Sequence, residues 1–163
     1  MTRPVADVST RIGLFIATCG YLGYAPVAPG TFGSFAGLIL FLGLRAAGST
    51  GLEIAAIGLL LAVGIWSGTV AEHHLGGVDP APVVIDEVAG MLITLALLPV
   101  TLFGAFVGFL VFRVLDVVKP WPSARFERLP GGLGVMADDG MAAVYGNLVM
   151  RGLIYAAPAG WLV

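Results

Sequence analysis

Long apolar segments, separated by short polar stretches, account for most of the chain. Residues 34–48, 52–71 and 140–163 are apolar runs, and a shorter one covers residues 12–25. Residues 88–112 contain no charged side chain. Runs of this length are typical of helices, because strands average roughly 5–6 residues. The pattern therefore predicts an all-α chain.

Two arrangements are compatible with the uncharged segment at residues 88–112. One is a single helix kinked at Pro99, and the other is a hairpin of two helices at residues 83–98 and 101–117. Proline either ends or kinks a helix, so its position suits both. We favour the hairpin, because it places the acidic residues before and after this segment on the same face of the molecule.

Composition places the chain among membrane proteins. Of its 163 residues, 58% are hydrophobic and only 11% are charged, whereas soluble domains carry roughly 25% charged residues. The length predicts a single domain over residues 1–163. We therefore expect one integral membrane helical bundle, with about four transmembrane helices and a short N-terminal apolar helix within residues 12–25.

Several partners and sites are disfavoured. The net charge of −2 comes with no basic patch, so nucleic acid is not an expected partner. Cys19 is the single cysteine, so no internal disulfide can form. His73 and His74 are adjacent and point to different faces of a helix, which makes them a poor chelating pair. The oligomeric state is not specified by any motif.

Charge is concentrated in residues 112–139. Of the 8 basic and 10 acidic residues in the chain, eight lie in these 28 positions: Arg113, Asp116, Lys119, Arg125, Glu127, Arg128, Asp138 and Asp139. Ions in or beside a membrane are costly and usually mark chemistry or a transport pathway. The alternative is a solvated loop between two apolar helices. The rigid segment at residues 119–122, with two prolines, argues against a flexible loop.

Five acidic residues are candidate metal ligands and catalytic groups: Asp86, Glu87, Asp116, Asp138 and Asp139, with Asp79 as a further neighbour. Hard oxygen ligands without paired Cys or His select Mg²⁺, Mn²⁺ or Ca²⁺ over zinc. Alternatively, the acids at residues 86–87 and 138–139 complement the dipoles of helix N-termini. That alternative leaves Asp116 unexplained at a helix C-terminus, although Arg113 is placed to neutralise its charge.

Basic residues accompany the acids. Lys119, Arg113 and Arg125 supply cations in the same stretch of chain. Acids that hold a metal and bases that hold an anion are the arrangement of phosphoryl-transfer sites. We therefore expect these three side chains to bind the substrate.

Two glycine-containing segments are candidate sources of backbone donors. In residues 26–34, two prolines and a glycine break one helix, and Thr31 or Ser34 is placed to cap the next. The N–H groups of a helix N-terminus bind anions, so Thr31 and Ser34 are candidate substrate ligands. A simple capped turn is the alternative. The glycine run at residues 131–134 allows close approach of the backbone to a ligand.

Charge bias predicts the orientation in the membrane. With the hairpin, residues 21–31, 72–87 and 113–139 lie on one face, which carries most of the basic side chains. The opposite face has only Arg45 nearby. Basic loops stay in the cytoplasm, so we expect a multi-pass protein whose active site faces the cytoplasm.

Four motifs, in this order and spacing, resemble the phosphatidylglycerophosphatase A family: PVAPGTFGS (26–34), DPAPVVIDEVAGM (79–91), FRVLDVVKPWP (112–122) and GGLGVMADD (131–139). The resemblance implies a Mg²⁺-dependent enzyme of the bacterial inner membrane. Such an enzyme removes the terminal phosphate of phosphatidylglycerophosphate and leaves phosphatidylglycerol. The resemblance implies catalytic and metal-binding roles for five motif acids: Asp86, Glu87, Asp116, Asp138 and Asp139. It implies that Lys119 is their basic partner.

We therefore expect a membrane phosphatase acting on a lipid phosphate. One or two Mg²⁺ ions would polarise phosphorus for in-line attack by water, while Lys119 and Arg113 or Arg125 hold phosphate oxygens. An aspartyl-phosphate intermediate is the mechanistic alternative. A phosphatidyltransferase would also use acids and Mg²⁺, but its DG-x-x-A-R motif is absent, since Asp139-Gly140 is followed by Met-Ala-Ala-Val. A transporter is a further alternative, but it would place ionisable residues inside its spans, whereas the acids here cluster at one end of the predicted bundle.

Overall fold

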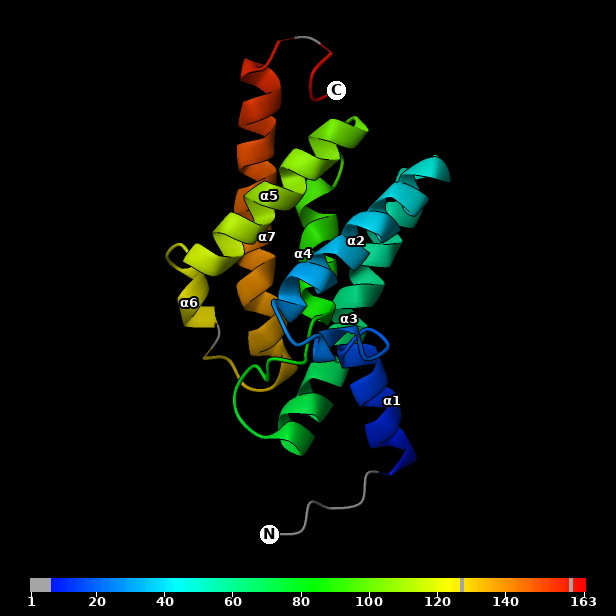
Figure 1. Ribbon diagram of the computed structural model, residues 1–163, viewed down its shortest axis with the longest axis vertical. Helices are drawn as coiled ribbons and strands as arrows, with labels where there is room; N and C mark the ends of the chain where they lie inside the picture. The colour runs from blue at the N-terminus through cyan, green and yellow to red at the C-terminus, as the bar shows by residue number, and fades with distance from the viewer. Residues whose placement is uncertain (1–6, 127, 159) are drawn as a thin grey trace.

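Every regular element that the structure describes is helical. The computed structural model describes residues 7–126, 128–158 and 160–163, so Glu127, counted among the charges above, lies outside the described residues. The elements are α1 (Val8–Ala17), the 3-10 turn η1 (Leu22–Tyr24), α2 (Pro29–Ala46), α3 (Thr50–Leu75), α4 (Ile85–Leu95), α5 (Leu102–Val118), α6 (Ser123–Phe126) and α7 (Gly132–Ala156) (Figure 1). The predicted all-α class is confirmed, and a short N-terminal helix is present, but it spans Val8–Ala17 and ends well before the predicted residue 25.

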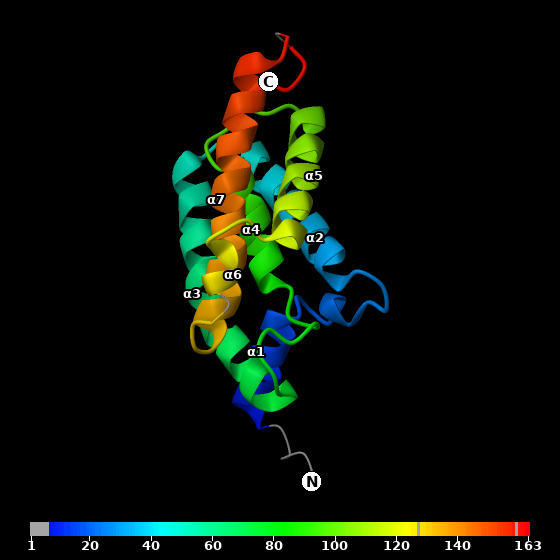
Figure 2. The same cartoon turned by 90° about the vertical axis from the view of Figure 1, so that its left-hand side faces the viewer.

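Helix α4 is the centre of the bundle, and α2, α3, α5 and α7 pack around it (Figures 1 and 2). Nine of its 11 residues are buried. Leu92 and Leu95 are fully buried in one core cluster with Phe41 of α2 and Phe112 of α5. A helix that is apolar on all sides is stable when other helices enclose it. The first turn of α4, which carries two of the candidate acids, is therefore fixed by its neighbours.

The predicted hairpin is confirmed, and the single kinked helix is wrong. Helix α4 ends at Leu95 and α5 begins at Leu102, with Thr101 as its N-cap. In the turn, Leu97 has a left-handed φ of 59°, and its N–H donates to Glu53 Oε1 at 3.1 Å. Glu53 is buried, so it stabilises the turn from the start of α3. Figure 1 shows this turn at the upper end of the bundle, away from α6.

A second polar residue closes the C-terminus of α4. The side-chain amide of Asn147 on α7 donates to the backbone oxygens of Ile93, Thr94 and Ala96 at 3.0–3.2 Å. Carbonyls at the end of a helix lack intrahelical partners, so this amide replaces the missing donors. Arg151 donates to Asn147 Oδ1 at 2.8 Å. This bond orients the Asn147 amide and gives Arg151, unexplained by any motif, a structural role.

Helix α2 begins earlier than expected. It starts at Pro29 in the first helical turn, and its N-cap Ala28 makes no side-chain capping bond. The expected cap by Thr31 or Ser34 is therefore wrong. Proline suits a first turn because its missing N–H would have no intrahelical partner there. Ser34 instead donates its hydroxyl hydrogen to the Gly30 carbonyl at 2.9 Å.

Helix α7 also begins earlier, at Gly132 rather than near residue 140. Asp138 and Asp139 therefore lie beyond its first turn, which contains no acidic residue. The dipole of a helix acts mainly on charges within the first turn. Interaction with a helix dipole therefore does not explain Asp138 and Asp139. It remains an explanation for Asp86, which lies in the first turn of α4.

Two helices in the described part of the chain, α2 and α3, are long and apolar enough to cross a membrane. Only 33% and 22% of their most apolar windows are buried, so both present apolar side chains outward. Helices α4 and α5 have 11 and 17 residues, fewer than the roughly 20 of a typical span. Length and composition thus support two spans, fewer than the predicted number.

Candidate active site

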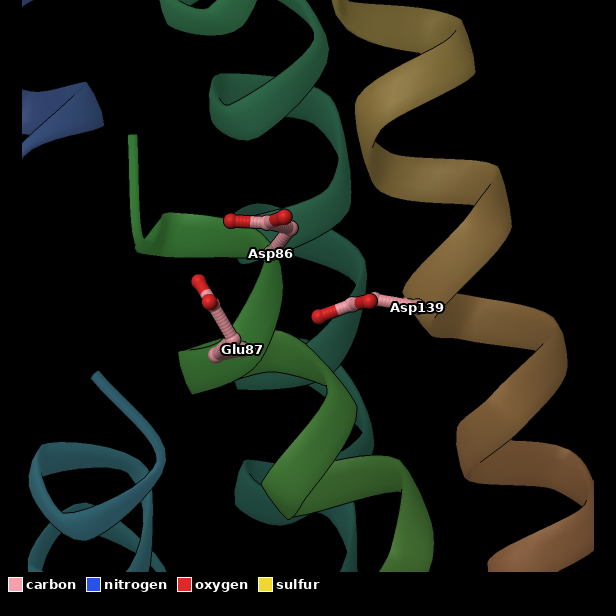
Figure 3. A group of neighbouring side chains, drawn as sticks. All are labelled: Asp86, Glu87 and Asp139. Atoms are coloured by element: carbon pink, nitrogen blue, oxygen red, sulfur yellow. The ribbon is translucent and has the colours of Figure 1, made fainter. Parts of the chain in front are cut away.

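Three of the predicted acids meet at one place between α4 and α7. Asp86 and Glu87 lie in the first turn of α4, and Asp139 projects from α7 toward them (Figure 3). Each offers a carboxylate oxygen, and these oxygens lie within 4.8 Å of one another. Asp86 and Asp139 are only 6% and 4% exposed. The hairpin produces this meeting, as the sequence predicted.

Several oxygens of these acids have no hydrogen-bond partner. The unpartnered buried carboxylate oxygens are Asp86 Oδ1, Glu87 Oε2, Asp138 Oδ1 and Asp139 Oδ2. A buried polar atom without a partner costs about 1–3 kcal/mol, and more when it is charged. Three of these acids, Asp86, Glu87 and Asp139, lie together, and leaving their oxygens unpartnered is unfavourable unless a cation lies among them.

Burial also changes how these acids ionise. The three carboxyls lie outside the two candidate membrane-crossing helices. Burial, followed by repulsion from neighbouring carboxylates, raises the pKa of Asp86 and of Asp139 well above the ordinary value. Burial raises the pKa of Glu87 to about 7. Raised pKa values mean that the protein alone disfavours the charged forms, and a bound cation would restore them.

Arg113 joins three helices at the edge of this acid cluster. From α5, its guanidinium donates to Asp116 Oδ2 at 2.6 Å and to Ser34 Oγ on α2 at 3.2 Å. The same nitrogen lies 3.9 Å from Glu87 Oε1 on α4. The predicted neutralisation of Asp116 by Arg113 is confirmed. Ser34 acts here on Arg113, so its hydroxyl positions a cation.

Lys119 and Asp138 form the second charged group of the site. Lys119 ends α5 in a left-handed conformation, with φ of 47°, and its ammonium pairs with Asp138 Oδ2. Asp116 and Asp138 are both electrostatic neighbours of Asp139, because repulsion from their carboxylates adds to burial in raising the pKa of Asp139. Three of the predicted acids therefore meet directly, while Asp116 and Asp138 lie beside them, paired with Arg113 and Lys119.

Two other predicted substrate ligands lie less centrally. Thr31 is half-buried in the first turn of α2. Arg125 is exposed on α6, and its guanidinium stacks over the Trp121 ring at 5.3 Å from the centroid. The structure thus places Thr31 next in sequence to Gly30, which lies against Glu87, and places Arg125 on the exposed side of α6.

The glycine run at residues 131–134 serves packing. The backbone of Gly132 lies against the Ile65 carbonyl of α3, and its N–H donates to Thr69 Oγ1 at 2.9 Å. This N–H is therefore not free to bind a ligand, contrary to the expectation from the sequence. The run brings α7 close to α3 instead.

Gly30 is a site residue whose role sequence reasoning missed. A Cβ atom at this position would clash with Glu87 Oε1 and lie 3.1 Å from the Arg113 guanidinium. Gly33 and Gly37 lie on the same face of α2 and also pack against the backbone of α4 and its N-cap. The signal in the sequence is the spacing of Gly30, Gly33 and Gly37 along one helix face. Close approach of α2 thus sets the position of the Glu87 carboxylate.

The donor set fits a hard divalent cation. Carboxylate oxygens are the ligands that Mg²⁺ and Ca²⁺ take in proteins, and the unpartnered oxygens described above are available for one. The cations Arg113 and Lys119 flank the same cluster. An all-helical fold with buried carboxylates and two flanking basic residues is the arrangement expected of an enzyme that acts on phosphate esters.

Comparisons with known proteins agree with this class. The family model of phosphatidylglycerophosphatase A matches residues 15–154. Phosphatidylglycerophosphatase A of Escherichia coli K12 is 34% identical over 145 residues, covering 85% of this chain and 79% of the relative. The Haemophilus influenzae protein of the same name is 33% identical over 156 residues, covering 94% and 96%. This chain therefore belongs to the phosphatidylglycerophosphatase A family.

A third relative carries a different name. A Bacteroides thetaiotaomicron protein, named provisionally as a phosphatidylinositol-3-phosphatase, is 34% identical over 148 residues and covers 86% of this chain and 89% of the relative. No solved structure matches the chain. All three relatives are named as phosphatases of phospholipid headgroups, which agrees with the site geometry.

Gly30→Ala is expected to lower the rate of phosphate release roughly tenfold or more. The added methyl group would displace the Glu87 carboxylate, and small displacements of catalytic groups have large effects on rate. Gly43→Ala, on the same helix, is the matched control, because a Cβ at Gly43 would meet no atom within 4 Å. Equal activity of the two variants would show that the close approach of α2 does not matter for the site.

Proposed function

We propose that this protein is a Mg²⁺-dependent phosphatase that converts phosphatidylglycerophosphate to phosphatidylglycerol and phosphate. The observation that carries the proposal is the buried acid cluster, with its unpartnered oxygens, beside Arg113 and Lys119. Membership of the phosphatidylglycerophosphatase A family supports the same substrate.

The residues divide into two groups by role. Asp86, Glu87 and Asp139 would hold Mg²⁺, with Asp116 and Asp138 beside them. When bound, Mg²⁺ supplies Lewis-acid polarisation of the phosphoryl group and neutralises charge on its oxygens.

Arg113 and Lys119 bind phosphate oxygens from the α5 side of the site. Arg113 is held in place by Asp116 and Ser34, so little reorganisation is needed when charge develops on the phosphoryl group. Asp116 and Asp138 keep both cations beside the acids. A site carboxylate that does not hold the metal would accept the proton released by the attacking water.

Phosphate release from the purified protein tests this proposal. We expect release from phosphatidylglycerophosphate with Mg²⁺, and loss of activity in excess chelator. Phosphatidylinositol 3-phosphate and a soluble phosphomonoester serve as comparison substrates. Release from the soluble ester alone would overturn the lipid assignment, and full activity in chelator would overturn the role of Mg²⁺.

We further propose that the protein is a multi-pass protein of the bacterial inner membrane with about four transmembrane helices. The apolar exteriors of α2 and α3 support membrane insertion. The site acids would lie at the cytoplasmic mouth of the bundle, outside the hydrocarbon, which agrees with the basic residues at that end.

Labelling of single cysteines in a Cys19→Ser background tests this orientation. Gly77→Cys and Arg125→Cys are expected to react with an impermeant reagent only from the cytoplasmic side, and Ser49→Cys only from the opposite side. Ser49 is the N-cap of α3, and the α2–α3 and α4–α5 turns lie at the same end of the molecule in Figure 1. Labelling of positions 77 and 125 from opposite sides would contradict the proposed topology.

A further inference from the structure

An apolar groove runs between α2 and α5. Its volume is about 690 Å³, and its walls include Phe35, Ile39 and Leu42 from α2 and Leu102, Phe103 and Phe106 from α5. We refer to it as the α2–α5 groove. The two helices lie side by side in both views of the fold (Figures 1 and 2). All of its lining residues are apolar, and Phe35, Ile39 and Phe106 are about half-exposed.

The α2–α5 groove and the acid cluster lie along the same two helices, with Arg113 about 10.5 Å beyond Phe106 along α5. Along α5, Arg113 follows Phe106 by seven residues, so the two lie on the same helix face. Along α2, Ser34 directly precedes Phe35. The hydrogen bond from Arg113 to Ser34 joins the two helices at 3.2 Å, and the same Arg113 nitrogen lies beside Glu87 and Asp116. The surface therefore changes from cationic to wholly apolar along a single direction.

This polarity pattern matches a phospholipid, which has a phosphate at one end and a hydrocarbon chain at the other. We propose that the α2–α5 groove holds one acyl chain of the phospholipid substrate while its terminal phosphate lies at Arg113 and the acids. The proposal rests on the proposed function and adds a binding site for the chain. Ile39 lies five residues beyond Ser34, about 7.5 Å along the helix axis, within reach of a long acyl chain.

The α2–α5 groove would mainly fix the position of the acyl chain and would add little to the affinity for the lipid. Lipid tails are as apolar as the groove, so moving a chain from the bilayer into it gains little from the hydrophobic effect. Close packing along the walls instead fixes where the chain lies, and hence where the attached headgroup lies. Reaction rates are sensitive to misplacement of reacting groups by about 1 Å.

Filling the groove tests the proposal. Ile39→Trp is expected to lower kcat/KM for long-chain phosphatidylglycerophosphate at least tenfold more than for the same headgroup without acyl chains. Leu40→Trp is the matched control, because Leu40 is also exposed on α2 but does not line the groove. Leu40→Trp is expected to change kcat/KM equally for the two substrates, by less than about twofold.

The two substrates separate the groove from the function itself. If the wild-type protein hydrolyses neither substrate, the proposed function fails. If the wild type is active and Ile39→Trp affects both substrates equally, the groove proposal is overturned. Equal losses together with a change in oligomeric state would indicate that a second copy of the chain occupies the groove.

Photo-crosslinking gives a measurement that is independent of turnover. A long-chain phosphatidylglycerophosphate with a diazirine in one acyl chain is expected to label α2 within residues 35–42 or α5 within 102–106. Ile39→Trp should reduce this labelling severalfold, and Leu40→Trp should not. Labelling spread evenly over the outer surfaces of α3 and α7 would contradict a specific chain site.

Discussion

Asp139→Asn is expected to lower kcat about 1,000-fold or more while the protein remains folded. The substitution removes one carboxylate charge from the cluster with Asp86 and Glu87, and preorganised charges at such sites contribute several kcal/mol to catalysis. Without metal, the loss of one of three repelling buried carboxylates should leave the melting temperature unchanged or raise it. The Mg²⁺-dependent rise in melting temperature should disappear.

Measurement of kcat and of melting temperature with and without Mg²⁺ checks both parts. Asp7→Asn is the control, because Asp7 caps α1 by accepting from the Thr10 N–H at 2.7 Å, away from the site. Asn caps a helix about as well as Asp, so this variant should behave as wild type. Near-normal kcat for Asp139→Asn would show that the acid has only a structural role.

Lys119→Ala is expected to lose roughly a hundredfold or more in kcat, whereas Arg128→Ala should lose little. The Lys119 ammonium pairs with buried Asp138, and its removal also leaves that carboxylate without this cation. Arg128 is exposed on the segment after α6. Its expected role is attraction to lipid headgroups, at about 1 kcal/mol per basic residue.

Lys119→Arg should rescue activity only in part. Arg presents a forked planar group in place of a point charge, so it would compete for both oxygens of Asp138. The measurement is kcat for the three variants at saturating Mg²⁺ in mixed micelles of fixed lipid fraction. If Arg128→Ala is as impaired as Lys119→Ala, Lys119 is not the residue that binds phosphate.

The sequence predicted the features that depend on local signals. Pro99 and the apolar runs on either side of it indicated the hairpin, and the hairpin brought Asp86 and Asp116 to one end. The i to i+3 spacing of Arg113 and Asp116 predicted their ion pair. Helical periodicity and charge spacing are local properties, so they can be read without knowledge of tertiary contacts.

Features that depend on distant contacts were missed. The early start of α7 is stabilised by Thr69 on α3, which accepts from the Gly132 N–H. The roles of Asn147 and Glu53 at the end of α4 depend on segments more than 40 residues away. Lys119 was expected as the basic partner of the motif acids, but which acid it pairs with, Asp138, depends on the left-handed turn that ends α5. None of these has a pattern that sequence periodicity can reveal.

The close approach of α2 to α4 has a consequence for how variants of this enzyme are interpreted. The contacting face of α2 contains glycines at positions 30, 33 and 37, where any side chain would meet α4 or its acids. A saturation scan should therefore find intolerance at positions that hold no reactive group. The outward face with Phe35 and Ile39 should accept other apolar residues for folding. Harmful substitutions in α2 would thus follow residue volume more closely than charge or polarity.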